Sequence, residues 1–162
     1  MRIPIEQLMA VYNGNLFAAA FNICKNAEDA RDAVQETFIA YCESNREFDS
    51  EQHIRAWLFR VVVNKAKDIR KSFWRRNSLP LEDYIQSLSF ESESDSALFT
   101  AVLHLPERYR VVIHLFYYED YSVKEIARIL HMTESNIKTC LSRGRKLLKA
   151  ALREDWSDDE QG

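Results

Sequence analysis

The chain has 162 residues, of which 46% are hydrophobic and 29% charged, and it contains only three Gly and three Pro. This composition can form a core in water but supplies too few turn residues for a sandwich or barrel of many strands. No apolar run approaches the roughly 20 residues that cross a bilayer, and the N-terminus lacks the layout of a signal peptide. We therefore expect an all-α protein that works in the cytoplasm and does not insert directly into a membrane.

Charge is strongly segregated along the chain, although the formal net charge is only −3. Two segments, Arg55–Arg76 and Lys138–Lys149, hold 13 of the 22 basic residues and only 1 of the 25 acidic ones. The rest of the chain has 9 basic and 24 acidic residues, a net charge of −15. Two basic patches on an acidic surface indicate two contacts with an anionic partner, and nucleic acid is the first candidate.

The residue types that perform catalysis are not arranged for it. Cys24, Cys42 and Cys140 are widely separated, so we expect them to be reduced and partly buried rather than bridged or bound to metal. The four histidines show no metal-ligand spacing, and there is no nucleophile motif or glycine-rich phosphate loop. We therefore expect no enzymatic activity, no metal and no cofactor.

The N-terminal half predicts three helices. The first spans Ile5–Cys24, and Asn26 can cap a second helix that begins at Ala27. A loop over Ser44–His53 precedes the third helix, which ends within Ser72–Ser78. The second helix has one apolar face, formed by Ala30, Val34, Phe38 and Tyr41. The third has basic residues opposite an apolar face, formed by Ile54, Trp57, Leu58, Val61 and Val62.

An acidic linker divides the chain into two small helical domains. No Lys or Arg occurs from Asn77 to Glu107, and Leu88–Ser96 is rich in Ser and acidic residues. Such a composition is typical of a flexible linker. We predict domains over residues 1–76 and 97–154, the linker over 77–96, and an acidic, frayed tail over 155–162.

The second domain begins with two helices and ends with a helix-turn-helix. A helix that includes Leu98 to Leu105 stops at Pro106, and Glu107–Tyr118 forms the next. Ser122 and Glu125 form a capping box that starts a helix at Val123, with an inner face of Val123, Ile126, Ala127 and Leu130. A short turn over residues 131–133 follows, and its last residue, Thr133, can cap the final helix. This spacing and capping predict a helix-turn-helix.

The final helix is suited to a DNA major groove. Its outer side carries side chains that can reach bases or phosphates, namely Lys138, Thr139, Ser142 and Arg143. Further backbone contacts would come from Arg145, Lys146 and Lys149. The alternative is an ordinary antiparallel helix pair with a solvated basic face. The capped turn and the lack of acidic residues favour DNA binding.

Three stretches together resemble a known family. They are "AEDARDAVQETFIAY" (Ala27–Tyr41), "IRAWLFRVVVNKAKDIRK" (Ile54–Lys71), and "LPERYRVVIHLFYYEDYSVKEIARIL" followed by "SRGRKLLK". In this order and spacing, over roughly Leu8–Leu152, the chain resembles bacterial RNA polymerase sigma factors of the sigma-70 family, extracytoplasmic function (ECF) group. The resemblance implies a region 2 helical bundle and a region 4 helix-turn-helix that direct core polymerase to promoters and help melt them.

The resemblance also implies sites in the first domain. The surface that docks on the β′ clamp helices of core polymerase would include Asp32, Gln35, Glu36 and Phe38. The alternative is that Asp32 and Glu36 form a solvated pair and that Phe38 belongs to the core. The −10 promoter element would meet a flipped-base pocket at Phe48 and the loop Asp49–His53. A helix face would read the adjacent DNA through Asn64, Lys67, Asp68 and Lys71, with phosphate contacts from Lys65, Arg70, Arg75 and Arg76. Trp57 and Leu58 are expected in the core.

In the second domain, the resemblance implies that the final helix binds the −35 promoter element and that an apolar outer surface touches the polymerase β flap. It also implies an anti-sigma factor, which in this group is often membrane-bound. Three residues depart from the family's pattern: His131 replaces a usual Gly, Cys140 a frequent Arg, and Gly144 a common Ala. His131 predicts either strain in the turn or a φ different from that of the usual Gly, and Gly144 lowers helix stability by about 1 kcal/mol.

Two other kinds of protein fit parts of the pattern. A transcriptional regulator could use the helix-turn-helix alone, as a dimer on a palindromic site, with the N-terminal half as a sensor. An interaction module could instead bind an acidic protein through its basic faces. The cluster Arg55–Arg76 favours the sigma factor, because a sensor domain has no need of it.

Overall fold

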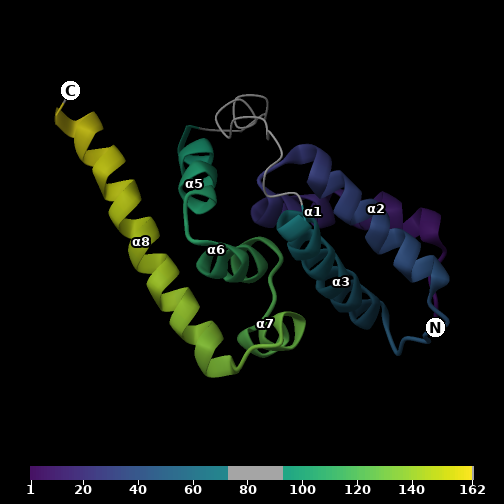
Figure 1. Cartoon of the computed structure of the whole chain (residues 1–162). Coiled ribbons are helices and arrows are strands. Elements are labelled where there is room, and N and C mark those ends of the chain that lie inside the picture. Colours follow the sequence, from purple (N-terminus) through teal and green to yellow (C-terminus); the bar gives the residue numbers. More distant parts are fainter. Residues whose placement is uncertain (73–92, 162) are drawn as a thin grey trace. The chain divides into compact units, whose positions relative to one another are not determined.

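The structure, a computed structural model, describes residues 1–72 and 93–161. Every regular element within those ranges is a helix, which confirms the all-α class, and the chain divides into two compact units (Figure 1). None of the described helices is long and apolar enough to cross a membrane. The predicted phosphate contacts Arg75 and Arg76, and residues 77–92 of the predicted linker, lie outside the described residues.

The first unit is a three-helix bundle of α1 (Ile5–Cys24), α2 (Ala27–Glu43) and α3 (Glu51–Ser72), in which each helix contacts the other two (Figure 1). Its core contains the apolar face predicted for α2 and much of that predicted for α3. Its fully buried large side chains are Leu8, Leu16, Phe21, Ile23, Ile54, Leu58 and Phe59. The bundle therefore leaves the opposite faces of α2 and α3 available for partners.

Local capping explains where these helices begin. The Asp29 N–H donates to Asn26 Oδ1 at 2.9 Å, which confirms the predicted cap of α2. The expectation that the loop continues to His53 was wrong, because α3 begins at Glu51. Ser50 ends the loop: its side-chain oxygen accepts from the His53 N–H at 3.2 Å, and its carbonyl accepts from the Ile54 N–H at 3.2 Å.

The second unit contains α5 (Glu93–Leu103), α6 (Glu107–Ile113), the π-helix η1 (His114–Tyr118), α7 (Val123–Leu130) as far as Ala127, and α8 (Glu134–Gln161). Both α5 and α6 contact the long helix α8 (Figure 1). The buried guanidinium of Arg110 donates to the carbonyls of Leu103 and Leu105, at 3.4 and 3.0 Å, so this cation satisfies the C-terminal end of α5.

Three boundaries in this unit differ from the sequence prediction. Helix α5 begins at Glu93, inside the range expected to be linker, and ends at Leu103, so Leu105 follows the helix while remaining buried. The expected helix over Glu107–Tyr118 finishes as a π-helix. The tail expected to fray is helical to Gln161, since neither Gly nor Pro interrupts α8 beyond Gly144.

Candidate nucleic-acid interface

The first helix of the helix-turn-helix, α7, is fixed by a reciprocal capping box. The Glu125 N–H donates to Ser122 Oγ at 3.1 Å, and the Ser122 N–H donates to Glu125 Oε1 at 3.3 Å. These bonds confirm the predicted start at Val123. Of the predicted inner face, Ile126 and Ala127 are buried, while Val123 and Leu130 are partly exposed.

The turn between α7 and α8 uses a left-handed residue that is not glycine. His131 has a φ of 54°, and the Met132 N–H donates to the Ala127 carbonyl at 3.0 Å, as in a Schellman-type helix end. The Asn136 N–H then donates to Thr133 Oγ1 at 3.1 Å, which confirms the predicted cap of α8. The strain expected at His131 is therefore present as a positive φ.

The outer face of α8 exposes most of the side chains predicted to reach the −35 element. Exposed there are Lys138, Thr139, Ser142, Arg143 and Lys146. On the inner face Ile137, Cys140 and Leu141 are buried. Arg145 lies differently, because its Nε donates to the Tyr117 hydroxyl at 2.5 Å and its guanidinium lies over the Phe116 and Tyr117 rings. Arg145 is exposed as well, but these contacts hold its guanidinium against η1.

Two of the three residues that depart from the family pattern, Cys140 and Gly144, are packed in the interior. Cys140 is only 7% exposed, and burial raises the pKa of its thiol, so it does not stand on the outer face of α8. Gly144 is buried against α6, where an added Cβ would lie 3.0 Å from Ile113 Cγ1 and 3.4 Å from Tyr109 Cβ. A glycine here permits the close approach of α8 and α6, which the sequence alone did not indicate.

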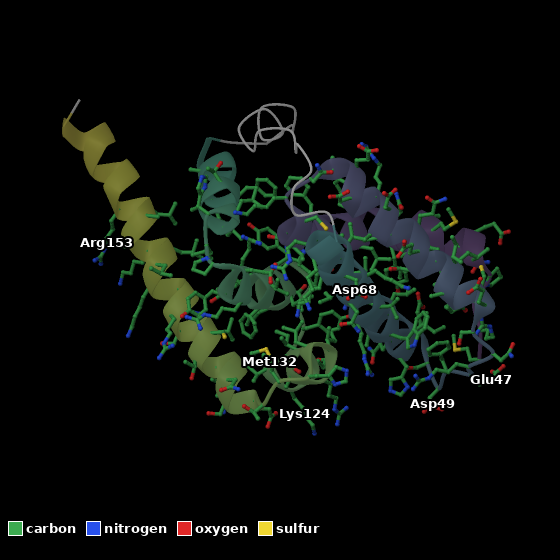
Figure 2. The ribbon with its side chains drawn as sticks, viewed as in Figure 1. Glu47, Asp49, Asp68, Lys124, Met132 and Arg153 are labelled. Atoms are coloured by element: carbon green, nitrogen blue, oxygen red, sulfur yellow. The ribbon has the colours of Figure 1, made fainter. Side chains whose placement is uncertain are left out.

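Helix α3 presents its predicted DNA-reading residues on one side of the bundle. Asn64, Asp68 and Lys71 are exposed and Lys67 is partly exposed. Leu58, as expected, is in the core, and Trp57 is only partly exposed. Figure 2 shows Asp68 along α3, with Glu47 and Asp49 at the loop before that helix. The loop therefore adjoins the N-terminal end of α3, whereas this helix face lies in its C-terminal half.

Phe48, which the family resemblance assigns to the flipped-base pocket, is buried. Its side chain is only 6% exposed and stacks on Tyr41 with ring centroids 6.0 Å apart, while Trp57 meets its edge at 5.8 Å. A ring held on both sides in this way is part of the core.

The residues expected to dock on core polymerase lie on α2. Asp32, Gln35 and Glu36 are exposed, whereas Phe38 is 6% exposed. Both Gln35 and Phe38 line a groove of about 670 Å³, here termed the α1–α2 groove, whose lining also includes Ile5, Met9, Phe17, Val34, Ile39 and Cys42. Phe38 therefore belongs to the core and at the same time lines this groove.

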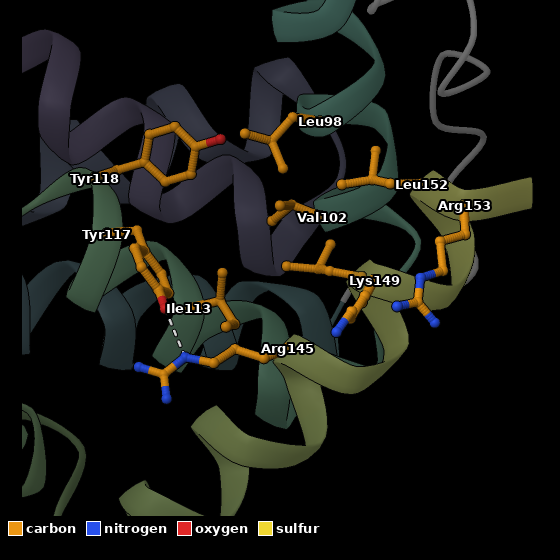
Figure 3. Close-up of a pocket in the computed structure, with 10 residues that line it drawn as sticks. Leu98, Val102, Ile113, Tyr117, Tyr118, Arg145, Lys149, Leu152 and Arg153 are labelled. Atoms are coloured by element: carbon orange, nitrogen blue, oxygen red, sulfur yellow. Dashed lines mark hydrogen bonds between the residues drawn. The ribbon is translucent and has the colours of Figure 1, made fainter. Parts of the chain in front are cut away.

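A second groove, of about 710 Å³, lies within the second unit. Its apolar lining comes from Leu98 and Val102 of α5, Ile113 of α6, Tyr117 and Tyr118 of η1, and Leu148 and Leu152 of α8. Three cations of α8 also line this α5–α8 groove: Arg145, Lys149 and Arg153 (Figure 3). Both grooves combine residues from separate helices, so periodicity within one helix did not reveal them.

Comparison with known proteins defines the class. A model described as Sigma-70 region 2 matches residues 8–79, and one described as Sigma-70, region 4 matches residues 96–148. The chain is 32% identical over 148 residues to the RNA polymerase sigma factor SigV of Bacillus subtilis, covering 88% of each chain. It is 24% identical to the ECF RNA polymerase sigma factor SigM of the same organism, covering 97% of this chain and 100% of that one.

A solved structure supports the same conclusion. CnrH, in complex with the cytosolic domain of CnrY, superposes with a TM-score of 0.69 at 28% identity, covering 93% of this chain and 88% of that one. The fold and the two matched regions therefore define a two-domain transcription initiation factor. The chain belongs to the sigma-70 family of RNA polymerase sigma factors, in its ECF group, and these comparisons do not favour a stand-alone regulator.

Proposed function

We propose that this sigma factor contacts promoter DNA through one surface on each unit. The observation that carries the proposal is the outer face of α8: it is capped at Thr133, exposes Lys138, Ser142 and Arg143, and has no acidic residue from Lys138 to Lys149. A helix with these properties would enter the major groove at the −35 element. Arg145 would contribute less, because Tyr117 already holds it.

The −10 element would be held by the first unit. Asn64, Lys67, Asp68 and Lys71 supply hydrogen-bonding and charged groups along one helix, and the loop Ser44–Ser50, which precedes that helix, would receive an unstacked base. The positive charge of Arg55–Lys71 supports contact with the phosphates of the opened strand. Phe48 would fix the position of this loop by packing its buried ring into the core.

Core polymerase would dock on both grooves. The exposed carboxylates of Asp32 and Glu36, beside the α1–α2 groove, suit the β′ clamp helices, while the α5–α8 groove suits an apolar segment of the β flap. The protein would act in the cytoplasm, where the polymerase works, and without catalysing a reaction itself. An anti-sigma factor would hold it inactive, as the resemblance to the ECF group implies, and CnrH likewise has a protein partner in its solved structure, the cytosolic domain of CnrY.

Run-off transcription with purified core polymerase tests the whole proposal. Promoter-specific transcripts should appear only when this chain is added to core enzyme. Core enzyme alone and the chain alone are the two controls. Tight, specific binding of duplex DNA by the chain alone, without any effect on initiation, would instead support the regulator and contradict the proposal.

The −35 contact is tested by the double variant Lys138→Ala, Arg143→Ala. Because each contact of this kind contributes about 1–3 kcal/mol, initiation at a promoter that depends on its −35 element should fall at least about tenfold. Affinity for core polymerase, measured by fluorescence anisotropy, should not change. Loss of core binding, or full initiation by the variant, would show that this face of α8 does not bind the −35 element.

A further inference from the structure

Residues 1–3 lie against the loop between α2 and α3, although that loop is distant from them in sequence. The Phe48 N–H donates to the Met1 carbonyl at 3.2 Å. The Tyr41 hydroxyl both accepts from the Ile3 N–H, at 2.9 Å, and donates to the Ile3 carbonyl, at 2.8 Å. Residues 1–3 therefore connect the last turn of α2 to the loop by hydrogen bonds to backbone atoms.

Arg2 makes the most specific of these connections. Its Nη1 donates to the Arg46 carbonyl and its Nη2 to the Tyr41 carbonyl, both at 2.7 Å, and its Cζ lies 4.2 Å from the centroid of the Tyr41 ring. The Tyr41 carbonyl lies in the last turn of α2, where a cation is favourable, and it also accepts from the Ser44 N–H at 3.3 Å. One planar guanidinium thus fixes the end of α2 and the start of the loop together.

The same contacts continue into the core. Tyr41 stacks on Phe48 with ring centroids 6.0 Å apart, and both rings form T-shaped contacts with Trp57. Arg2 lies over Tyr41, and Arg46 lies over Phe48. The aromatic rings therefore anchor the loop through Phe48, and residues 1–3 anchor it through hydrogen bonds to its backbone. Glu47 and Asp49 remain exposed.

We propose that residues 1–3 position the loop Ser44–Ser50 for capture of the unstacked −10 base, with Arg2 and Tyr41 as the positioning residues. This inference rests on the proposed −10 role of that loop. A loop that is ordered before binding loses less conformational freedom when it meets single-stranded DNA. Neither side chain needs to touch the DNA, because each acts through the loop backbone.

The test uses holoenzyme assembled from core polymerase and the full chain. The probe is a fluorescent oligonucleotide with the non-template −10 strand of a promoter that the wild type transcribes. Arg2→Ala and Tyr41→Phe should each weaken oligonucleotide binding about fivefold or more, with unchanged affinity for core polymerase. Hydrogen exchange at the Phe48 amide should become faster in both. Gln7→Ala is the matched control, since its exposed side chain lies on α1, and it should bind as the wild type does.

Two further measurements separate positioning from other effects. On an oligonucleotide with an abasic site at the position to which the wild type is most sensitive, Arg2→Ala and the wild type should bind alike. Arg2→Lys keeps the charge but cannot bridge two carbonyls, so it should remain impaired. Full binding by Arg2→Lys, or wild-type binding by both Arg2→Ala and Tyr41→Phe, would overturn the inference. Failure of the wild type to support transcription would instead overturn the proposed function.

Discussion

At the scale of single residues, His131 has a strained backbone conformation that a substitution can relieve. Its φ of 54° is a left-handed conformation that costs a residue with a Cβ about 1–2 kcal/mol, and its side chain is exposed. Glycine removes that cost, although it adds some entropy to the unfolded chain. His131→Gly should therefore raise the free energy of unfolding of the protein by about 1 kcal/mol and its Tm by about 4 °C.

Thermal unfolding followed by circular dichroism measures this change. His131→Ala is the matched control, because it removes the imidazole but keeps the Cβ that causes the strain. We expect the alanine variant to stay within about 0.5 kcal/mol of the wild type. Equal stabilisation by both substitutions would show that the imidazole, and not the backbone conformation, is unfavourable at this turn.

At the scale of elements, helix starts could be predicted where a local signal sets them. Asn26, Ser122 and Thr133 each cap a helix through bonds to residues within three positions, and the structure confirms all three caps. The positions of Phe48 and Arg145 could not be predicted in this way. Phe48 packs on Tyr41 of the preceding helix, and Arg145 is held by Tyr117 of η1. Periodicity within one helix carries no information about partners in other elements.

The contact between α8 and α6 gives a prediction at this scale. Helix propensity alone favours Gly144→Ala by about 1 kcal/mol, but the new Cβ would lie 3.0 Å from Ile113 Cγ1 in a closely packed contact. The two effects should nearly cancel, whereas Gly144→Leu should lower the free energy of unfolding by about 2 kcal/mol or more. Urea unfolding measures both changes.

The exposed position Ala150 provides a reference on the same helix. Ala150→Gly reports helix propensity without a packing term and should cost about 1 kcal/mol. A gain of the full 1 kcal/mol in Gly144→Ala would mean that Ile113 yields easily, so that Gly144 is not required for the approach of α8. A loss in Gly144→Leu no larger than that of Ala150→Gly would lead to the same conclusion.

At the scale of the whole molecule, the segregation of charge matches the division into units. The described part of the first basic segment, Arg55–Lys71, lies on α3 of one unit, and the second, Lys138–Lys149, lies on α8 of the other. The sequence predicted this organisation correctly because charge is a property of composition and needs no knowledge of packing. The acidic remainder, with its net charge of −15, would repel DNA elsewhere and confine binding to these two surfaces.

Two separate surfaces predict additive dependence on salt. Each phosphate contact contributes about 0.9 to the slope of log K against log salt concentration. For holoenzyme binding to promoter DNA, replacing the predicted phosphate contacts by Lys65→Ala with Arg70→Ala should reduce the magnitude of that slope by about 2, as should Lys138→Ala with Arg143→Ala. The fourfold variant should reduce it by about 4. Assembly with core polymerase, titrated over the same salt range, is the control and should be unchanged. A fourfold variant with the slope of either double variant would show that the two basic segments do not bind the DNA independently.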